Sequence, residues 1–132
     1  MEIKVGEYVR TIDGYIRKVT QVNEKGTYQA RAFGKYETDV DYKNSKCISE
    51  KKITKHSSNI IDLIEVGDYV NGYKVVDIME DMKTGELHLE MTADYTNQEI
   101  GDCTIYNKNI KTIVTHEQMR EMEYKVWQNK NY

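Results

Sequence analysis

One segment of the sequence occurs twice with small changes. Residues 6–9 (GEYV) return as residues 67–70 (GDYV), and the stretches KVTQV and KVVDI follow them in the same order. Segments repeated at this spacing indicate structural units that pack on their neighbours. We therefore predict two tandem units, residues 1–64 and residues 65–132. Because a unit of about 60 residues buries only a marginal core, the two units are expected to pack side by side.

The kinds of apolar residue indicate β structure. Ile and Val number 13 and 11 against 3 Leu, and there are 11 Tyr. Branched and aromatic side chains favour strands, and residues 28–32 and 87–91 alternate apolar with polar side chains, as half-buried strands do. Since the chain has no Pro, turns are expected at four pairs that contain Gly: Asp13-Gly14, Lys25-Gly26, Asn71-Gly72 and Thr84-Gly85.

Each unit also contains a short helical turn with a cap. Thr115 and Gln118 have the spacing of a capping box, and Ser57 is the matching cap of the first unit. Apolar pairs follow the caps on one face of each turn: Ile61 with Ile64, and Met119 with Met122. We interpret these pairs as plugs at the end of a small barrel, with an adaptable binding surface as the alternative for the Met pair. With the capped turn placed before the closing strand, the pattern predicts a mainly β fold of two tandem SH3-like or KOW-like barrels.

No motif points to a catalytic centre. His56, His88 and His116 do not share a metal-binding spacing, and neither Cys47 nor Cys103 lies in a C-x-x-C pair, whereas a structural zinc needs four clustered ligands. A nucleophile made of Cys47 and His56 is conceivable, but the polar segment between them gives no reason to expect contact. Glycine-rich phosphate-binding loops are absent. We therefore predict no enzyme activity, no catalytic residue, no metal and no cofactor.

The second half of the chain is acidic. Residues 67–132 contain 12 Asp and Glu against 7 Lys and Arg, whereas residues 1–66 contain 10 against 12. The pair Glu80-Asp81 could bind a divalent cation, but such a hairpin tip is as a rule a solvated turn. An acidic face attracts a basic partner surface and disfavours nucleic acid, although ordinary solubility is the alternative. The predicted partner-binding residues are Asp77, Glu80, Asp81, Asp94, Tyr95 and Asp102, with Tyr95 as an aromatic anchor.

The first half interleaves basic and aromatic residues, which can hold phosphates and stack bases. Tyr in strands more often serves packing, so nucleic-acid binding through the first unit is the second hypothesis. A small hydrolase is the third. The basic residues are Arg10, Arg17, Lys18, Arg31 and Lys35, and the aromatic residues are Tyr8, Tyr15, Tyr28 and Phe33.

Two further expectations concern the less regular parts and the location of the protein. Residues 34–52 are polar and predict a loop-rich segment with at most one edge strand, and residues 128–132 predict a loose tail. The start, MEIKVGEYVR, lacks an apolar signal segment, and no apolar run is long enough to span a membrane. We therefore predict a cytoplasmic protein whose cysteines remain thiols.

Residues 55–75 (KHSSNIIDLIEVGDYVNGYKV) and 111–126 (KTIVTHEQMREMEYKV) carry a resemblance. They are similar to segments of small proteins encoded by phages, prophages and mobile elements of Firmicutes, which tend to begin with a stretch like VGEYVRT-DGYI. The resemblance implies an accessory protein of a bacterial cytoplasm, and proteins in that setting are often inhibitors of host machinery, including anti-CRISPR and other counter-defence proteins. The leading hypothesis is thus a non-enzymatic protein that blocks a surface of a host protein.

Overall fold

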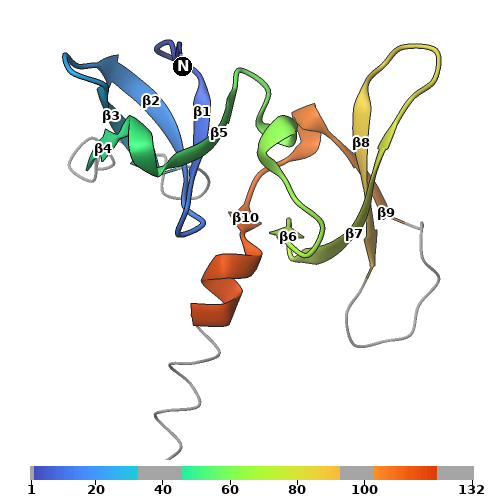
Figure 1. The fold of residues 1–132 in the computed structure, drawn as a ribbon. Coiled ribbons are helices and arrows are strands. Elements are labelled where there is room, and N and C mark those ends of the chain that lie inside the picture. The colour runs from blue at the N-terminus through green and yellow to red at the C-terminus, as the bar shows by residue number, and fades with distance from the viewer. Residues whose placement is uncertain (1, 33–45, 93–102, 122–132) are drawn as a thin grey trace, which may run out of the picture.

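The computed structural model describes residues 2–32, 46–92 and 103–121. In this part of the chain, ten strands form two five-stranded antiparallel sheets, which confirms the prediction of a mainly β protein. The first sheet lies at the left of Figure 1 and the second at the right, with the short C-terminal helix, residues 116–121, below the region between them. No helix in the described ranges is long and apolar enough to cross a bilayer.

The first sheet is built from the first half of the chain. Its strands are β1 (Tyr8–Thr11), β2 (Ile16–Val22), β3 (Thr27–Ala32), β4 (Lys46–Ser49) and β5 (Ile53–Ser57). Their order in the sheet is β4-β3-β2-β1-β5, and all pairs are antiparallel. A 3₁₀ turn, η2 (Glu50–Lys52), connects β4 to β5. In the segment 34–52, the described residues thus contain the single edge strand that the sequence predicted.

The second sheet is built from the second half. Its strands are β6 (Tyr69–Val70), β7 (Tyr73–Glu80), β8 (Leu87–Thr92), β9 (Cys103–Tyr106) and β10 (Ile113–Val114). Their order is β10-β6-β7-β8-β9. Two more 3₁₀ turns flank this sheet along the chain: η3 (Ile60–Leu63) precedes β6, and η4 (Asn107–Asn109) connects β9 to β10.

The two sheets have the same internal order. If the strands of each half are numbered one to five along the chain, their spatial order in both sheets is 4-3-2-1-5. In both halves a 3₁₀ turn precedes the fifth strand along the chain. The repeated segment also makes the same hydrogen bonds, because the N–H of Gly6 donates to Val19 O and the N–H of Gly67 donates to Val75 O, both at 2.9 Å. The φ angles of Gly6 and Gly67 are 94° and 102°, which L side chains rarely adopt. This backbone requirement explains why Gly recurs in both copies.

The four predicted turns are confirmed. The glycine of each pair has a positive φ: 88° at Gly14, 70° at Gly26, 89° at Gly72 and 74° at Gly85. At Asn71-Gly72 both residues have positive φ, and they connect β6 to β7 directly. Two residues of this conformation form the type I′ turn that matches the twist of paired strands.

Buried side chains form two clusters that divide unequally between the halves. The smaller cluster, which includes Val9, Val19 and Tyr28, comes from the first half alone. The larger cluster fills the second sheet with Val70, Leu89 and Met91 among others, and it also contains Ile16 of β2 and the residues of η3. The first half therefore contributes apolar side chains to the core of the second.

The two predicted apolar pairs differ in their burial. Ile61 and Ile64 are buried, at 4% and 3% exposure, as predicted. They pack in the cluster of the second sheet, however, rather than beneath the first. Met119 is only half-buried, so the prediction that it fills a core was wrong, because the short helix lies at the edge of the sheets. Met122 and the tail 128–132 lie outside the described residues.

The order of turn and closing strand was also predicted wrongly. The capped turns follow the fifth strands, since η3 comes after β5 and residues 116–121 come after β10. Ser57 does not cap η3, whose N-cap is Asn59; the hydroxyl of Ser57 accepts a hydrogen bond from the N–H of Asn59 at 3.0 Å. In the described part of the chain, the end strands of each sheet are not paired with each other, so no closed barrel is identified.

Candidate functional site

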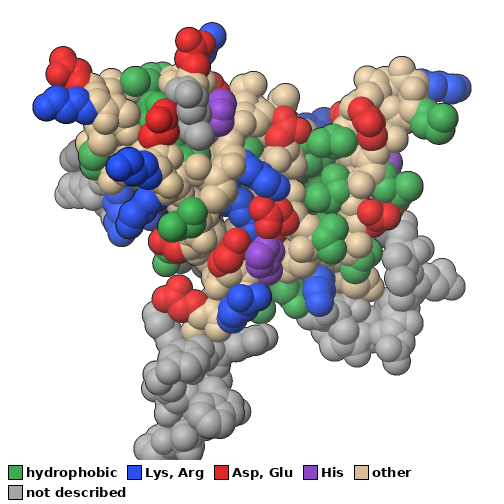
Figure 2. Space-filling model, in the orientation of Figure 1, with side chains coloured by type: hydrophobic (Ala, Val, Ile, Leu, Met, Phe, Trp, Pro, Cys, Tyr) green, Lys and Arg blue, Asp and Glu red, His purple; other side chains and the backbone are tan. Residues whose placement is uncertain are grey.

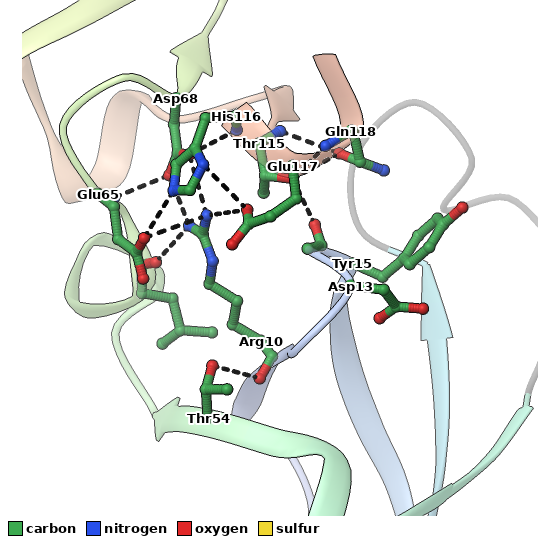
Figure 3. A network of polar contacts seen from close by, with 12 residues as sticks. Arg10, Asp13, Tyr15, Thr54, Glu65, Asp68, Thr115, His116, Glu117 and Gln118 are labelled. Carbon is green, nitrogen blue, oxygen red and sulfur yellow. Dashed lines mark hydrogen bonds and ion pairs between the residues drawn. The ribbon is translucent and has the colours of Figure 1, made fainter. Parts of the chain in front are cut away.

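A buried arginine connects the two halves of the chain. Arg10, on β1, is 0% exposed. Its guanidinium donates to the carbonyl oxygen of Leu63 at 2.9 Å, to both oxygens of Asp68 at 2.5 and 3.0 Å, and to Oε1 of Glu117 at 2.6 Å (Figure 3). Burial alone would lower the pKa of Arg10, but Asp68 and Glu117 outweigh it and raise the pKa above the usual range. The arginine therefore stays charged, and its partners all come from beyond the first sheet.

The contacts of Asp68 explain why an acidic residue recurs in the repeated Gly-acid-Tyr-Val segment. Its carboxylate accepts the N–H of Glu65 at 2.8 Å and the N–H of His116 at 2.9 Å. In the first copy, the carboxylate of Glu7 accepts the N–H of Lys4 at 2.9 Å in the same way. Each acid thus fixes the turn three residues before it. Only the second acid is fully buried, because only there does an arginine from the other half compensate its charge.

The rim of this network reaches the surface. His116 Nε2 lies 2.8 Å from Oε1 of Glu65, and Lys55 Nζ lies 3.2 Å from Oε2 of the same residue. Burial by itself raises the pKa of Glu65, but the contacts with His116, Lys55 and Arg10 together lower it below its usual value. In Figure 2, acidic, basic and His side chains meet at the surface between the two sheets. We call the residues around Arg10 the junction network: Arg10, Glu65, Asp68, His116 and Glu117.

The helix cap completes the junction. The hydroxyl of Thr115, which is fully buried, donates to the carbonyl oxygen of Gly14 at 2.6 Å. The N–H of Thr115 donates to Oε1 of Gln118 at 3.0 Å, and the N–H of Gln118 donates to Oγ1 of Thr115 at 3.3 Å. These reciprocal bonds confirm the predicted capping box. The β1–β2 turn therefore rests directly on the first turn of the C-terminal helix (Figure 3).

The junction network contains the ligand types of a metal site. Ligand atoms of Glu65, His116 and Glu117 lie within 4.8 Å of one another, which makes them the one group of this kind among the described residues. Arg10 Nη2, however, lies 2.6 Å from Oε1 of Glu117 and 3.6 Å from Oε1 of Glu65. A guanidinium that close to both carboxylates repels a second cation and occupies their lone pairs. The geometry is therefore that of an internal ion-pair network and does not fit a metal.

The cysteine–histidine alternative receives no support from the geometry. Cys47 lies on β4 and His56 on β5, which are the two end strands of the first sheet. Nδ1 of His56 lies 2.7 Å from Oε1 of Glu7. Cys47 is exposed, and the amide of Asn23 lies 3.9 Å from its sulfur.

The predicted partner-binding residues are only partly described. Asp77, Glu80 and Asp81 are exposed and lie along β7 and in the turn that connects it to β8. Oδ1 of Asp81 accepts the N–H groups of Lys83 and Thr84 at 2.8 and 3.0 Å. These bonds lower the pKa of Asp81, so this carboxylate serves the turn. The remaining members lie outside the described residues: Asp94, Tyr95 and Asp102.

The same hairpin carries exposed methionines, which sequence reasoning missed. Met82, at the turn, is 100% exposed and Met79 is 45% exposed. In Figure 1 the hairpin of β7 and β8 projects beyond the rest of the second sheet, and in Figure 2 apolar and acidic side chains alternate along it. We call Asp77, Met79, Glu80 and Met82 the hairpin patch. The available signal was the sequence MEDM at residues 79–82, which places two Met beside two acids at a turn.

Those basic and aromatic residues of the first half that the structure describes do not form one surface. Arg10 and Tyr28 are buried, at 0% and 5% exposure, and so cannot contact a nucleic acid. Two of the remaining cations face a ring of the same sheet: Lys18 lies 5.7 Å from the centroid of Tyr8, and the Arg17 guanidinium lies 5.4 Å from that of Tyr15. Phe33 and Lys35 lie outside the described residues.

Comparison of the chain with protein-family models, with curated proteins and with solved structures finds no match.

Proposed function

We propose that this protein is a non-enzymatic binding protein whose hairpin patch occupies a basic surface of a host protein. The observation that carries the proposal is Met82, an apolar side chain left wholly in solvent at the tip of a projecting hairpin. Methionine is flexible and polarisable, and it recurs at surfaces that adapt to a partner. Asp77 and Glu80, exposed on the same hairpin, would steer that patch toward positive charge.

The proposed architecture is two SH3-like modules held as one body. In each half a 3₁₀ turn precedes the fifth strand, and the strand order is the same; these features support the assignment. The junction network bears on function as well, because Arg10 has its partners in the other half. A fixed arrangement of two modules lowers the entropy lost on docking. A phage-type inhibitor that blocks its target sterically fits this description.

The chemistry of the polar clusters favours binding over catalysis. The most concentrated group of titratable side chains, the junction network, is used in internal ion pairs. An active site would instead leave a nucleophile or base directed at a substrate.

The proposal is tested by capture from host lysate with paired variants. The first variant, Asp77→Lys with Glu80→Lys and Met82→Ser, alters the hairpin patch and leaves Asp81 to hold the turn. The control variant, Val22→Ser with Glu24→Lys, makes similar changes on the corresponding β2–β3 hairpin, where both residues are exposed. We expect one host protein to be retained by the wild type and the control and to be lost with the hairpin variant.

The captured protein is then purified and its association rate measured at several salt concentrations. We expect the hairpin variant to associate more slowly and with a weaker salt dependence than the wild type, because rim charges act mainly on the association rate. Equal capture by both variants, or unchanged rates, would refute the hairpin patch as the contact.

A further inference from the structure

The first sheet contains a cavity that the proposed function does not use. Its volume is about 500 Å³, and it lies between the β1–β2 turn and β4. β3 separates β2 from β4 within the sheet, and residues of both β2 and β4 line the cavity. The side chains that matter for its chemistry are Asp13, Tyr15, Arg17, Lys46 and Lys52.

Arg17 is the unusual member of this group. It is 9% exposed, and burial lowers its pKa, with Tyr15 and Asp13 opposing the change less strongly. Among the described residues, no carboxylate oxygen lies within 4.0 Å of it. Arg10 is buried to a similar degree, but it has Asp68 and Glu117 at hydrogen-bond distance. Within the described residues, one buried arginine is therefore paired with carboxylates and the other is not.

The remaining charges around the cavity are mainly positive. Lys46 and Lys52 are exposed at its edge, and Asp13 is the one carboxylate among the described residues that line it. The hydroxyl of Thr11 donates to that carboxylate. Basic side chains also gather over the first sheet in Figure 2. Three cations against one acid give the cavity a positive potential, which is strengthened by the partial burial of Arg17.

We propose that this cavity binds the phosphate group of a small phosphorylated molecule. Arginine offers paired N–H donors that match phosphate oxygens, and lysines add charge around them. The volume lies within the usual range for small-molecule pockets, about 300–1,000 Å³. The ligand supplies the negative charge that Arg17 lacks.

The site belongs to the first half alone. Arg17 is paired across the sheet with Val9, and the corresponding pair in the second sheet is Tyr73 with Val70. The position of the buried cation is thus taken by an aromatic residue in the second half. Phosphate binding is accordingly a function that one copy of the repeat has and the other lacks.

Isothermal titration calorimetry with the full chain measures binding to the cavity. The probes are inorganic phosphate, AMP and a short single-stranded oligonucleotide, with adenosine as the uncharged control. We expect AMP and phosphate to bind in a saturable way and adenosine to give no binding.

Three variants test whether AMP binds at this cavity. Arg17→Gln should weaken AMP binding by about tenfold or more, because a charge-assisted hydrogen bond is lost. Lys52→Gln, at an exposed position, should weaken it by a smaller factor and keeps the test valid if Arg17→Gln fails to fold. Lys51→Gln is the matched control, since Lys51 is the exposed neighbour of Lys52 and does not line the cavity.

Two results would overturn the proposal. The first is that no phosphate probe binds, or that all three variants weaken binding equally. The second is binding of the oligonucleotide alone, with affinity that rises with its length, which would assign the cavity to nucleic acid instead. Neither result bears on the hairpin patch, so this proposal and the proposed function can fail separately.

Discussion

Substituting Gly14 and Gly72 separately measures the contact between the β1–β2 turn and the C-terminal helix. The two glycines hold corresponding positions in the repeat and have φ angles of 88° and 89°. Around Gly72 an added Cβ would meet nothing within 4 Å. At Gly14 the same Cβ would lie 2.5 Å from Oγ1 of Thr115 and 2.6 Å from Cβ of Glu117. Gly72→Ala is therefore a matched control for Gly14→Ala.

The magnitudes follow from these neighbours. A left-handed backbone costs an L residue roughly 1–2 kcal/mol, and this is the whole effect expected for Gly72→Ala. Gly14→Ala adds overpacking, about 1–3 kcal/mol, because Cβ of Glu117 belongs to a helix and can retreat only if the helix moves. If the helix moves, the bond from Thr115 to Gly14 is lost as well, at roughly 0.5–1.5 kcal/mol. For Gly14→Ala we expect the free energy of unfolding to fall by about 2.5–6.5 kcal/mol, the sum of these ranges.

Urea unfolding followed by circular dichroism at neutral pH measures both variants. The junction is supported if Gly14→Ala is less stable than Gly72→Ala by at least about 1 kcal/mol, the lower end of the overpacking range. Equal losses of unfolding free energy in the two variants would refute the reasoning, because the positive φ that both positions share would then account for the whole effect.

Three further predictions concern the same molecule. Arg10→Met should destabilise the protein by about 3–5 kcal/mol because it leaves Asp68 charged and buried, and Asp68→Asn in that background should recover part of the loss in a double-mutant cycle measured by urea unfolding. The folded-state pKa of Glu65 lies below its unfolded value of 4.5, so its stabilisation is complete above that pH and is lost as the pH falls through the folded pKa; urea midpoints from pH 7 to pH 3 should decline less in Glu65→Gln than in the wild type. Ile61→Ala should cost about 2–5 kcal/mol because the side chain is buried, whereas Met119→Ala should cost clearly less; equal losses in thermal unfolding would contradict the burial difference.

Much of the fold could be predicted from the sequence because its signals are local. The turns at Asn71-Gly72 and Gly14 depend on backbone conformations that only a few residues adopt. The capping box at Thr115 depends on a fixed spacing to Gln118. The repeat predicted corresponding elements, since one backbone arrangement requires the same Gly and acid in each copy. The division at residue 64 itself remains a prediction.

The site could not be predicted in the same way, because its members are far apart along the chain. Arg10 stands between two ordinary strand residues, Val9 and Thr11. No local sequence pattern indicates that Asp68 and Glu117 will contact it. Its placement among nucleic-acid-binding candidates was therefore wrong. The exposure of Met82 was missed for a related reason, since an apolar residue near a turn can equally point inward.

The strands of the first sheet all precede those of the second along the chain, so the sheets are synthesised one after the other. When β5 leaves the ribosome, every backbone pairing of the first sheet can form. The guanidinium of Arg10 then lacks its ion-pair partners until Asp68, and later Glu117, has been synthesised. A nascent first half would hold this cation in place without its counter-charges, which is costly. The junction network thus makes the stability of the first half depend on residues that are translated after it, and a product released before them would lack these ion-pair partners.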